Sequence, residues 1–245
     1  MDDVNQTEAG QVRPERQWRP LNRVQRRVAG VLVEKAKTVP ETYPMTLNGI
    51  VTASNQKSNR SPKMELSERQ VEEVLEELRS MGAVIEVHGG GRVPKYKHCL
   101  YEWLGVDKVE LAIMAELLLR GEQTLGDLRS RVSRMEEIPD MSYLQPRIRE
   151  LIEKELVQSL TPAGRGQVVS HALYESQEQD ALALQFPDAG AEARSDIDAG
   201  PASVSVAPVG EVHELKMKIQ ELTNRVEALE KQWSEFQNAS DSDQH

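Results

Sequence analysis

The pattern of hydrophobic and polar positions along the chain occurs twice. Apolar residues recur at helical spacing from Val71, two short alternating stretches follow, and the first copy closes at Glu102. A second copy runs over residues 144–175, with equivalent residues 73 positions apart, so that His98 corresponds to His171. A repeat that keeps its spacing through a helix, a turn and two strands predicts a duplicated domain.

Each copy has the pattern of three helices followed by a β-hairpin. In the first copy, a helix begins near Leu21, a second begins after Thr46 as N-cap, and residues 67–70 form a capping box that opens a third. Residues 83–88 and 93–100 read as strands around a glycine-rich turn. This order is typical of a winged helix, in which the hairpin is the wing.

The predicted fold class is α+β, mostly α, with two tandem winged-helix domains, a disordered linker and a C-terminal coiled-coil helix. The expected segments are a flexible basic arm (1–20), the first domain (21–104), the second domain (105–176), an acidic linker (177–210), the coiled-coil helix (211–237) and a disordered tail (238–245). Within the arm, Trp18 is interpreted either as an aromatic that stacks on nucleic acid or as a side chain that docks on the first domain.

Beyond the linker, apolar residues alternate spacings of three and four, which is a heptad pattern. The residues of this seam, expected to form a dimer interface, are Val212, Leu215, Ile219, Leu222, Val226, Leu229, Trp233 and Phe236. β-Branched residues at the a positions favour a parallel dimer, and the flanking Glu211–Lys216 and Arg225–Glu230 pairs favour the same orientation. The alternative is a single amphipathic helix that folds back on the domains.

Composition restricts the class of protein. No apolar run approaches the roughly 20 residues needed to cross a bilayer, and the first ten residues are too acidic and polar for a signal peptide. The single cysteine, Cys99, excludes an internal disulfide and fits a reducing compartment. We therefore expect a cytoplasmic protein that does not bind membranes.

Charge is distributed unevenly along the chain, whose net charge is −10. Residues 11–104 contain 16 Lys and Arg against 11 Asp and Glu, whereas residues 176–245 contain 5 against 14. Only the first domain is basic, and its cations lie where a winged helix can approach a phosphate backbone. The residues expected to contact double-stranded DNA are Lys57, Arg60 and Lys63 between the second and third helices, and Arg92, Lys95 and Lys97 on the wing.

The third helix of the first domain argues against insertion into the major groove. Its solvent side is acidic, with Glu68, Glu72, Glu73, Glu76 and Glu77. The alternative function is therefore a protein-interaction adaptor that presents the acidic helix of residues 67–80 to a basic partner and is dimerised by the coiled coil. In the second domain, Arg147 and Arg149 make the equivalent helix slightly better suited to DNA.

Motifs for catalysis are not found. The chain has no phosphate-binding loop, no nucleophile elbow and no His-Glu-x-x-His sequence. His98 and Cys99 are adjacent on a strand and point to opposite faces, so they could not easily bind one metal ion. We expect no enzymatic activity, no cofactor and no metal.

The first domain also resembles a known family. The stretch over residues 43–48, the sequence Asn-Gln-Lys-Ser-Asn-Arg at 55–60 and the wing end at 95–98 look like the YceH family of uncharacterised bacterial proteins. The resemblance covers about residues 21–174. It implies tandem winged helices in a cytoplasmic bacterial protein and supplies no catalytic residues.

Overall fold

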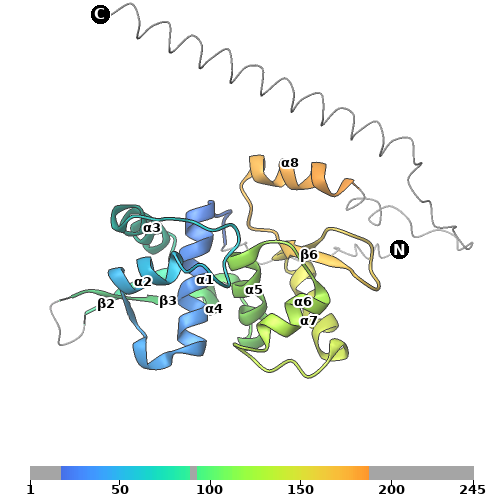
Figure 1. Ribbon diagram of the computed structural model, residues 1–245, viewed down its shortest axis with the longest axis horizontal. Coiled ribbons are helices and arrows are strands. Elements are labelled where there is room, and N and C mark those ends of the chain that lie inside the picture. The colour runs from blue at the N-terminus through green and yellow to red at the C-terminus, as the bar shows by residue number, and fades with distance from the viewer. Residues whose placement is uncertain (1–17, 89–92, 188–245) are drawn as a thin grey trace, which may run out of the picture. The chain divides into compact units, whose positions relative to one another are not determined.

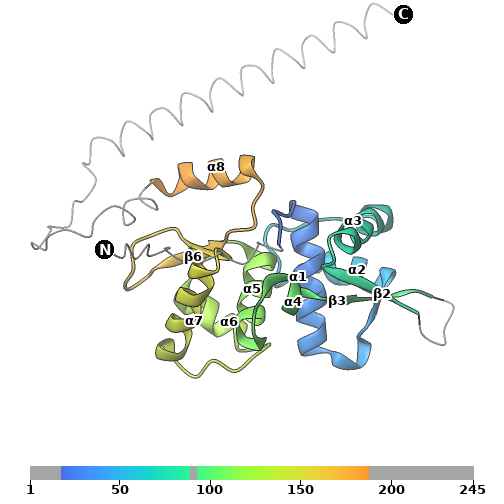
Figure 2. The same ribbon diagram turned by 180° about the vertical axis from the view of Figure 1, so that it is seen from behind.

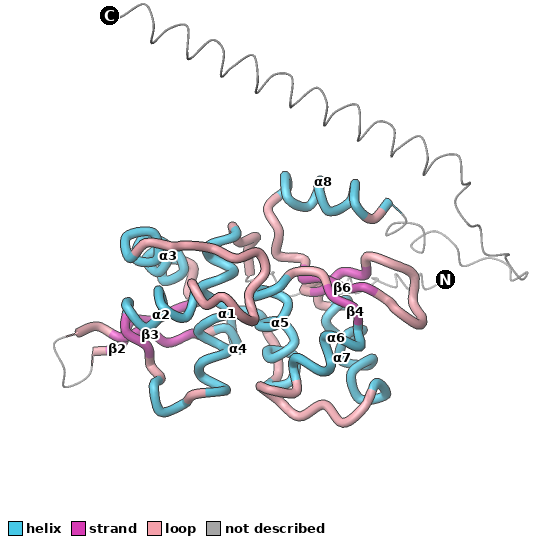
Figure 3. Tube along the Cα trace, viewed as in Figure 1, coloured by secondary structure: helices cyan, strands magenta, loops and turns pink. Residues whose placement is uncertain are grey.

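A computed structural model describes residues 18–88 and 93–187 and shows two successive copies of one element order (Figures 1 and 3). The elements of the first copy are α1 (Arg23–Thr38), the 3-10 turn η1 (Pro40–Thr42), β1 (Met45–Thr46), α2 (Leu47–Ser54), α3 (Glu68–Ser80), β2 (Val84–Val87) and β3 (Lys95–His98). A short helix, α4 (Leu100–Leu104), connects the copies. The elements of the second copy are α5 (Lys108–Arg120), β4 (Gln123–Thr124), α6 (Leu125–Val132), α7 (Met141–Glu153), β5 (Val157–Ser159) and β6 (Val168–His171). A last helix, α8 (Ser176–Gln185), follows.

Each copy contains a three-stranded antiparallel sheet with the hairpin's second strand in the middle. The strand orders are β1-β3-β2 and β4-β6-β5. Val84 pairs with His98 in the first sheet, and Val157 pairs with His171 in the second. The duplication expected from the sequence is therefore confirmed down to strand register.

Side-chain caps start the helices where the sequence predicts. Thr46 accepts a hydrogen bond from the backbone N–H of Gly49 at the start of α2. Ser67 and Gln70 form the expected capping box at α3, and Thr124 accepts from the backbone N–H of Asp127 at the start of α6. Such caps satisfy N–H groups that have no partner inside the helix, so they define where each helix begins.

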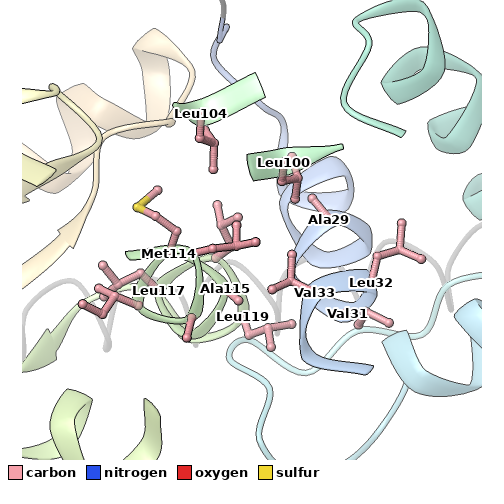
Figure 4. Packing of buried hydrophobic residues seen from close by; sticks show 14 of the residues in the cluster. Ala29, Val31, Leu32, Val33, Leu100, Leu104, Met114, Ala115, Leu117 and Leu119 are labelled. Atoms are coloured by element: carbon pink, nitrogen blue, oxygen red, sulfur yellow. The ribbon is translucent and has the colours of Figure 1, made fainter. Parts of the chain in front are cut away.

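A single hydrophobic core extends across both copies, because α1 and α5 pack side by side (Figures 1 and 2). Figure 4 shows Val33 of α1 facing Ala115 and Leu119 of α5. Gly30 lies at this contact, and a Cβ atom there would come within 2.8 Å of the Cγ atom of Leu119. Glycine at this position therefore allows the two helices to approach closely.

The segment predicted as a linker from residue 177 begins instead with helix α8, which corrects the boundary. Glu178 accepts two hydrogen bonds of 2.7 Å from the guanidinium of Arg26 in α1, and Leu182 is buried. The helix has no apolar stripe of its own, so its pattern in sequence resembles that of a linker. It is held by the bidentate ion pair with Arg26, by the buried Leu182, and by two hydrogen bonds that the side chains of Gln179 and Gln158 of β5 exchange, at 2.7 and 3.1 Å.

Trp18, at the start of the described residues, is 8% exposed and belongs to the hydrophobic core. Its burial agrees with docking rather than with stacking on nucleic acid. The arm before it and the predicted coiled-coil residues lie outside the described residues. Within the described part of the chain, no helix combines the length and apolarity that a membrane span needs.

Candidate nucleic-acid interface

The wing strand β3 presents its two lysines to solvent. Lys95 and Lys97 are exposed, whereas Tyr96 and His98 between and after them are buried, as strand alternation requires. Neither lysine makes an ion pair with a described residue. Both ammonium groups are therefore free to meet an anion.

Lys95 borders a hollow of about 500 Å³ at the start of α2. Thr46, the N-cap of α2, and Gly49 of its first turn line this hollow, as does Lys35 of α1, whose ammonium lies 3.8 Å from the carboxylate of Glu34. The N-terminal end of a helix carries partial positive charge from its unpaired N–H groups. Because two lysines and the N-terminal end of a helix border this hollow, it could bind a phosphate group.

The same hollow is bordered by one polar face of α2. Asn48 and Thr52 of α2 line it, as does Gln56, which follows the helix four residues later and accepts a hydrogen bond from Arg60. Amide and hydroxyl groups at this spacing donate and accept hydrogen bonds along one side of the helix. These three side chains were not among the predicted site residues, although their spacing is visible in the sequence.

The loop between α2 and α3 contains the other predicted cations, and the structure separates them. Lys57 and Lys63 are exposed and make no ion pair with any described residue. Asn55 folds inward: its side chain donates to the carbonyl of Leu66 at 2.8 Å and accepts from the N–H of Leu66 at 2.7 Å. The loop is thus fixed at its base while its lysines stay at the surface.

Arg60 is an interior residue, which corrects its expected place on the surface. Its side chain has 0% exposure and forms an ion pair with Glu34 of α1 at 2.6 Å. It also donates to the carbonyl of Ala53 at 3.1 Å and to the side chain of Gln56 at 3.1 Å. A buried guanidinium needs such partners because desolvation of an unpaired charge is costly. Arg60 therefore does not belong to the candidate interface.

Further buried charges connect the copies, and the sequence analysis missed them. Glu116 of α5 has a fully buried side chain and forms ion pairs with Arg120 at 2.8 Å and Arg134 at 3.2 Å. Arg134 also lies 3.8 Å from Glu34, and Arg120 donates to the side chain of Asn59. Burial raises the pKa of Glu116, and the neighbouring arginines oppose this shift. A charged residue within an apolar helix such as α5 is the signal that could have revealed this network.

The acidic surface of α3 is present as expected. Glu68, Glu72, Glu73 and Glu76 are exposed. Arg69 lies 2.9 Å from Glu73, and Arg79 pairs with Glu76 and with Glu86 of β2. The arginines of this helix are thus occupied by its own carboxylates or by a neighbouring strand, and α3 offers no free cation to a phosphate.

The equivalent helix of the second copy, α7, has two arginines at its solvent side, of which Arg149 makes no ion pair with a described residue. Arg147 stacks over the ring of Tyr143 at 5.2 Å and lies 3.8 Å from Glu150. Arg149 is exposed and, with Gln145, borders a hollow of about 250 Å³ beside the hairpin turn.

Three predicted sets remain to be placed. Arg92 lies in the turn between β2 and β3, outside the described residues, as do the residues of the heptad seam. His98 is buried, and in the parts of the chain that the structure describes no three His, Cys, Asp or Glu side chains gather as a metal site.

The family described as "Protein of unknown function, DUF480" matches residues 21–165, which include the loop at residues 55–60, the buried Arg60 and the whole of the first hairpin. The chain belongs to the DUF480 family. The match ends within the second hairpin, so the family region contains both copies except the last strand.

Relatives of the DUF480 chain occur in several bacteria. A UPF0502 protein of Rhodopirellula baltica is 50% identical over 193 residues, which cover 78% of this chain and 81% of that protein. A UPF0502 protein of Geobacter sulfurreducens is 48% identical over 134 residues, covering 55% and 61%. One from Acidovorax sp. is 35% identical over 220 residues, covering 86% and 96%. These names state a family and no activity.

Proposed function

We propose that both copies are winged helices and that the protein is a non-enzymatic DNA-associated protein of YceH type. The helix order and the three-stranded sheets support the fold assignment. The observation that carries the function is that Lys57, Lys63, Lys95 and Lys97 are exposed and make no ion pair with a described residue.

The mode of binding follows from the charges. The acidic surface of α3 would be repelled by the two phosphate strands that line a major groove, so this helix does not read bases. The lysines of the wing and loop contact phosphates, and the hollow at the start of α2 accepts one of them. Such contacts position a protein on duplex DNA without selecting a sequence.

The test is fluorescence anisotropy of the full chain with mixed-sequence duplex DNA across a salt series. Four phosphate contacts predict that affinity falls on the order of a hundredfold between 50 and 200 mM salt. Replacing Lys57, Lys63, Lys95 and Lys97 with alanine should abolish most binding. A control variant with Arg69, Arg79, Arg149 and Arg165 changed to alanine loses the same charge elsewhere and should retain it. Equal losses in both variants would contradict the assigned surface.

A second candidate function is a protein-interaction adaptor, favoured by the exposed glutamates of α3. Changing Glu72, Glu73 and Glu76 to lysine separates the two. A DNA-binding protein should gain affinity for the duplex, because repulsion becomes attraction. An adaptor should show no DNA binding in either form and should lose its basic partner.

We further propose that residues 211–237 form a parallel coiled-coil dimer. The support is the unbroken heptad pattern of the sequence. Light scattering on the full chain and on a chain ending at Gln185 is the measurement. Equal monomer masses for both chains would exclude the dimer.

A further inference from the structure

A second hollow of the first copy lies where β3 ends and α4 begins, away from the start of α2. Its volume is about 950 Å³, within the size range of sites for small organic molecules. Residues from the end of α1, the end of α3 and the segment after η1 complete its wall. Four parts of the first copy therefore meet around this pocket.

Cations outnumber anions around the pocket. Arg19, Lys37 and Lys97 line it together with a single carboxylate, that of Glu102. Lys37 is held in place, since it lies 3.2 Å from Glu136 and donates to the carbonyl of Lys108 at 2.9 Å. Lys97 is exposed and makes no ion pair with a described residue. In a chain of net charge −10, this local excess of cations favours an anionic ligand.

Aromatic rings form one side of the same pocket. The ring of His98 lies 5.9 Å from that of Tyr43 and 5.7 Å from that of Tyr101, both tilted. The hydroxyl of Tyr43 accepts a hydrogen bond from the backbone N–H of His98 at 2.7 Å. Burial raises the pKa of Tyr43 to about 12, so the hydroxyl stays protonated and can donate a hydrogen bond to a ligand.

In the second copy the equivalent corner, where the central strand β6 ends and Tyr174 follows, is closed. There, the ring of His171 lies only 3.9 Å from that of Tyr174, and Tyr174 shares a hydrogen bond of 2.9 Å with Ser170. Ser170 occupies the strand position that Lys97 occupies in the first copy. The first copy thus has wider ring spacing and a cation where the second copy has a small residue bonded to the tyrosine.

We propose that this pocket binds a small organic anion that carries an aromatic ring. The ring packs against Tyr43 and Tyr101, and the anionic group meets Lys97 and Arg19. Charge-assisted hydrogen bonds to lysine and arginine are among the stronger contacts available to a carboxylate or phosphate. The inference does not depend on DNA binding, because the pocket is complete without it.

The test is isothermal titration calorimetry of the full chain with phenyl phosphate, inorganic phosphate and benzyl alcohol. Phenyl phosphate combines the two features that the other probes have singly, so it should bind at least about tenfold more tightly than either. Inorganic phosphate binding as tightly as phenyl phosphate would overturn the role of the ring. No saturable binding of phenyl phosphate at millimolar concentration would overturn the proposal as a whole.

Two variants locate the site. Lys97→Ser introduces the residue of the second copy and should weaken phenyl phosphate binding about tenfold, the effect of one charge-assisted contact. Arg165→Ser removes an exposed cation of the second hairpin that does not line the pocket, so it should leave binding unchanged. Circular dichroism checks that both variants fold. Equal effects of the two substitutions would overturn the assigned place, and the measurement uses no DNA, so it is independent of the proposed function.

Discussion

The two copies of the repeat treat the same corner differently. In both, a histidine on the central strand accepts a hydrogen bond from a backbone N–H two residues later, 3.4 Å at His98 and 3.2 Å at His171. In the second copy, Arg26 lies 4.8 Å from the ring centroid of Tyr174, and the same arginine binds Glu178 of α8. In the second copy, the place where the central strand ends is therefore covered by Arg26 of α1, which is in turn bound to α8. In the first copy, the equivalent place borders a pocket.

Within this repeated sequence pattern, the residues that maintain the fold can therefore be told apart from those that form the proposed binding surface. The shared histidine fixes the turn that leaves the sheet, and it is buried in both copies. The residues around it then diverge: in the second copy a serine and a tyrosine ring 3.9 Å from the histidine close this place, and in the first copy a lysine and a tyrosine ring 5.7 Å away leave it open. Duplication allows one copy to keep the fold while the other changes its surface.

The largest expected effect is a difference in stability between two equivalent tyrosines. Tyr174→Ala removes the ring contact with His171, the contact with Arg26 and the hydrogen bond to Ser170, so it should lower the free energy of unfolding by about 3 kcal/mol. Tyr101→Ala removes a side chain that is 37% exposed and should cost about 1 kcal/mol. Urea denaturation measures both. Equal losses would mean that the two corners are equally closed.

Much of this fold is predictable from the sequence, because local chemistry determines it. The caps at Thr46 and Ser67 are set by side chains that satisfy helix N–H groups within a few residues. The hairpins follow from alternation and turn residues. Helix α8 could not be predicted in the same way, since its contacts join residues that are separated in sequence: Glu178 with Arg26, and Gln179 with Gln158.

The candidate sites were predictable only in part. Exposed lysines on the wing follow from strand alternation, so Lys95 and Lys97 were found. Arg60 was misplaced because a polar loop offers no sign that one of its cations turns inward to Glu34 of α1. The pocket beside His98 was missed because its wall combines four segments, and only the fold brings Lys37 and Lys97 together.

A second expected effect concerns pH. Burial and the nearby Lys97 and Lys37 lower the pKa of His98 to about 4, while Glu102 partly opposes this shift. Burial and the nearby Arg26 lower the pKa of His171 well below its usual value. A lowered pKa in the folded state means that the unfolded chain binds more protons, so stability is complete above about pH 6.5 and falls as the pH decreases below it.

The measurement is urea denaturation between pH 7.5 and pH 5. His98 alone should reduce the free energy of unfolding by about 2 kcal/mol from pH 7.5 to pH 5. Changing either His98 or His171 to glutamine should reduce the slope of the free energy of unfolding against pH, by the equivalent of about one proton taken up on unfolding. A His98 variant with the slope of the original chain would show that the first corner is open enough to solvate the charged imidazole, and would widen the difference between the copies.

The smallest expected effect isolates one hydroxyl in each corner. Tyr174→Phe removes the hydrogen bond with Ser170, whose side chain is buried, so it should lower the free energy of unfolding by about 1 kcal/mol. Tyr101→Phe removes a hydroxyl that forms no hydrogen bond with a described residue, and stability should stay within about 0.5 kcal/mol. Urea denaturation at pH 7.5, where both histidines are neutral, separates the two. If Tyr101→Phe cost as much as Tyr174→Phe, the Tyr101 hydroxyl would have a structural partner, and the open corner would be more closed than its ring spacing indicates.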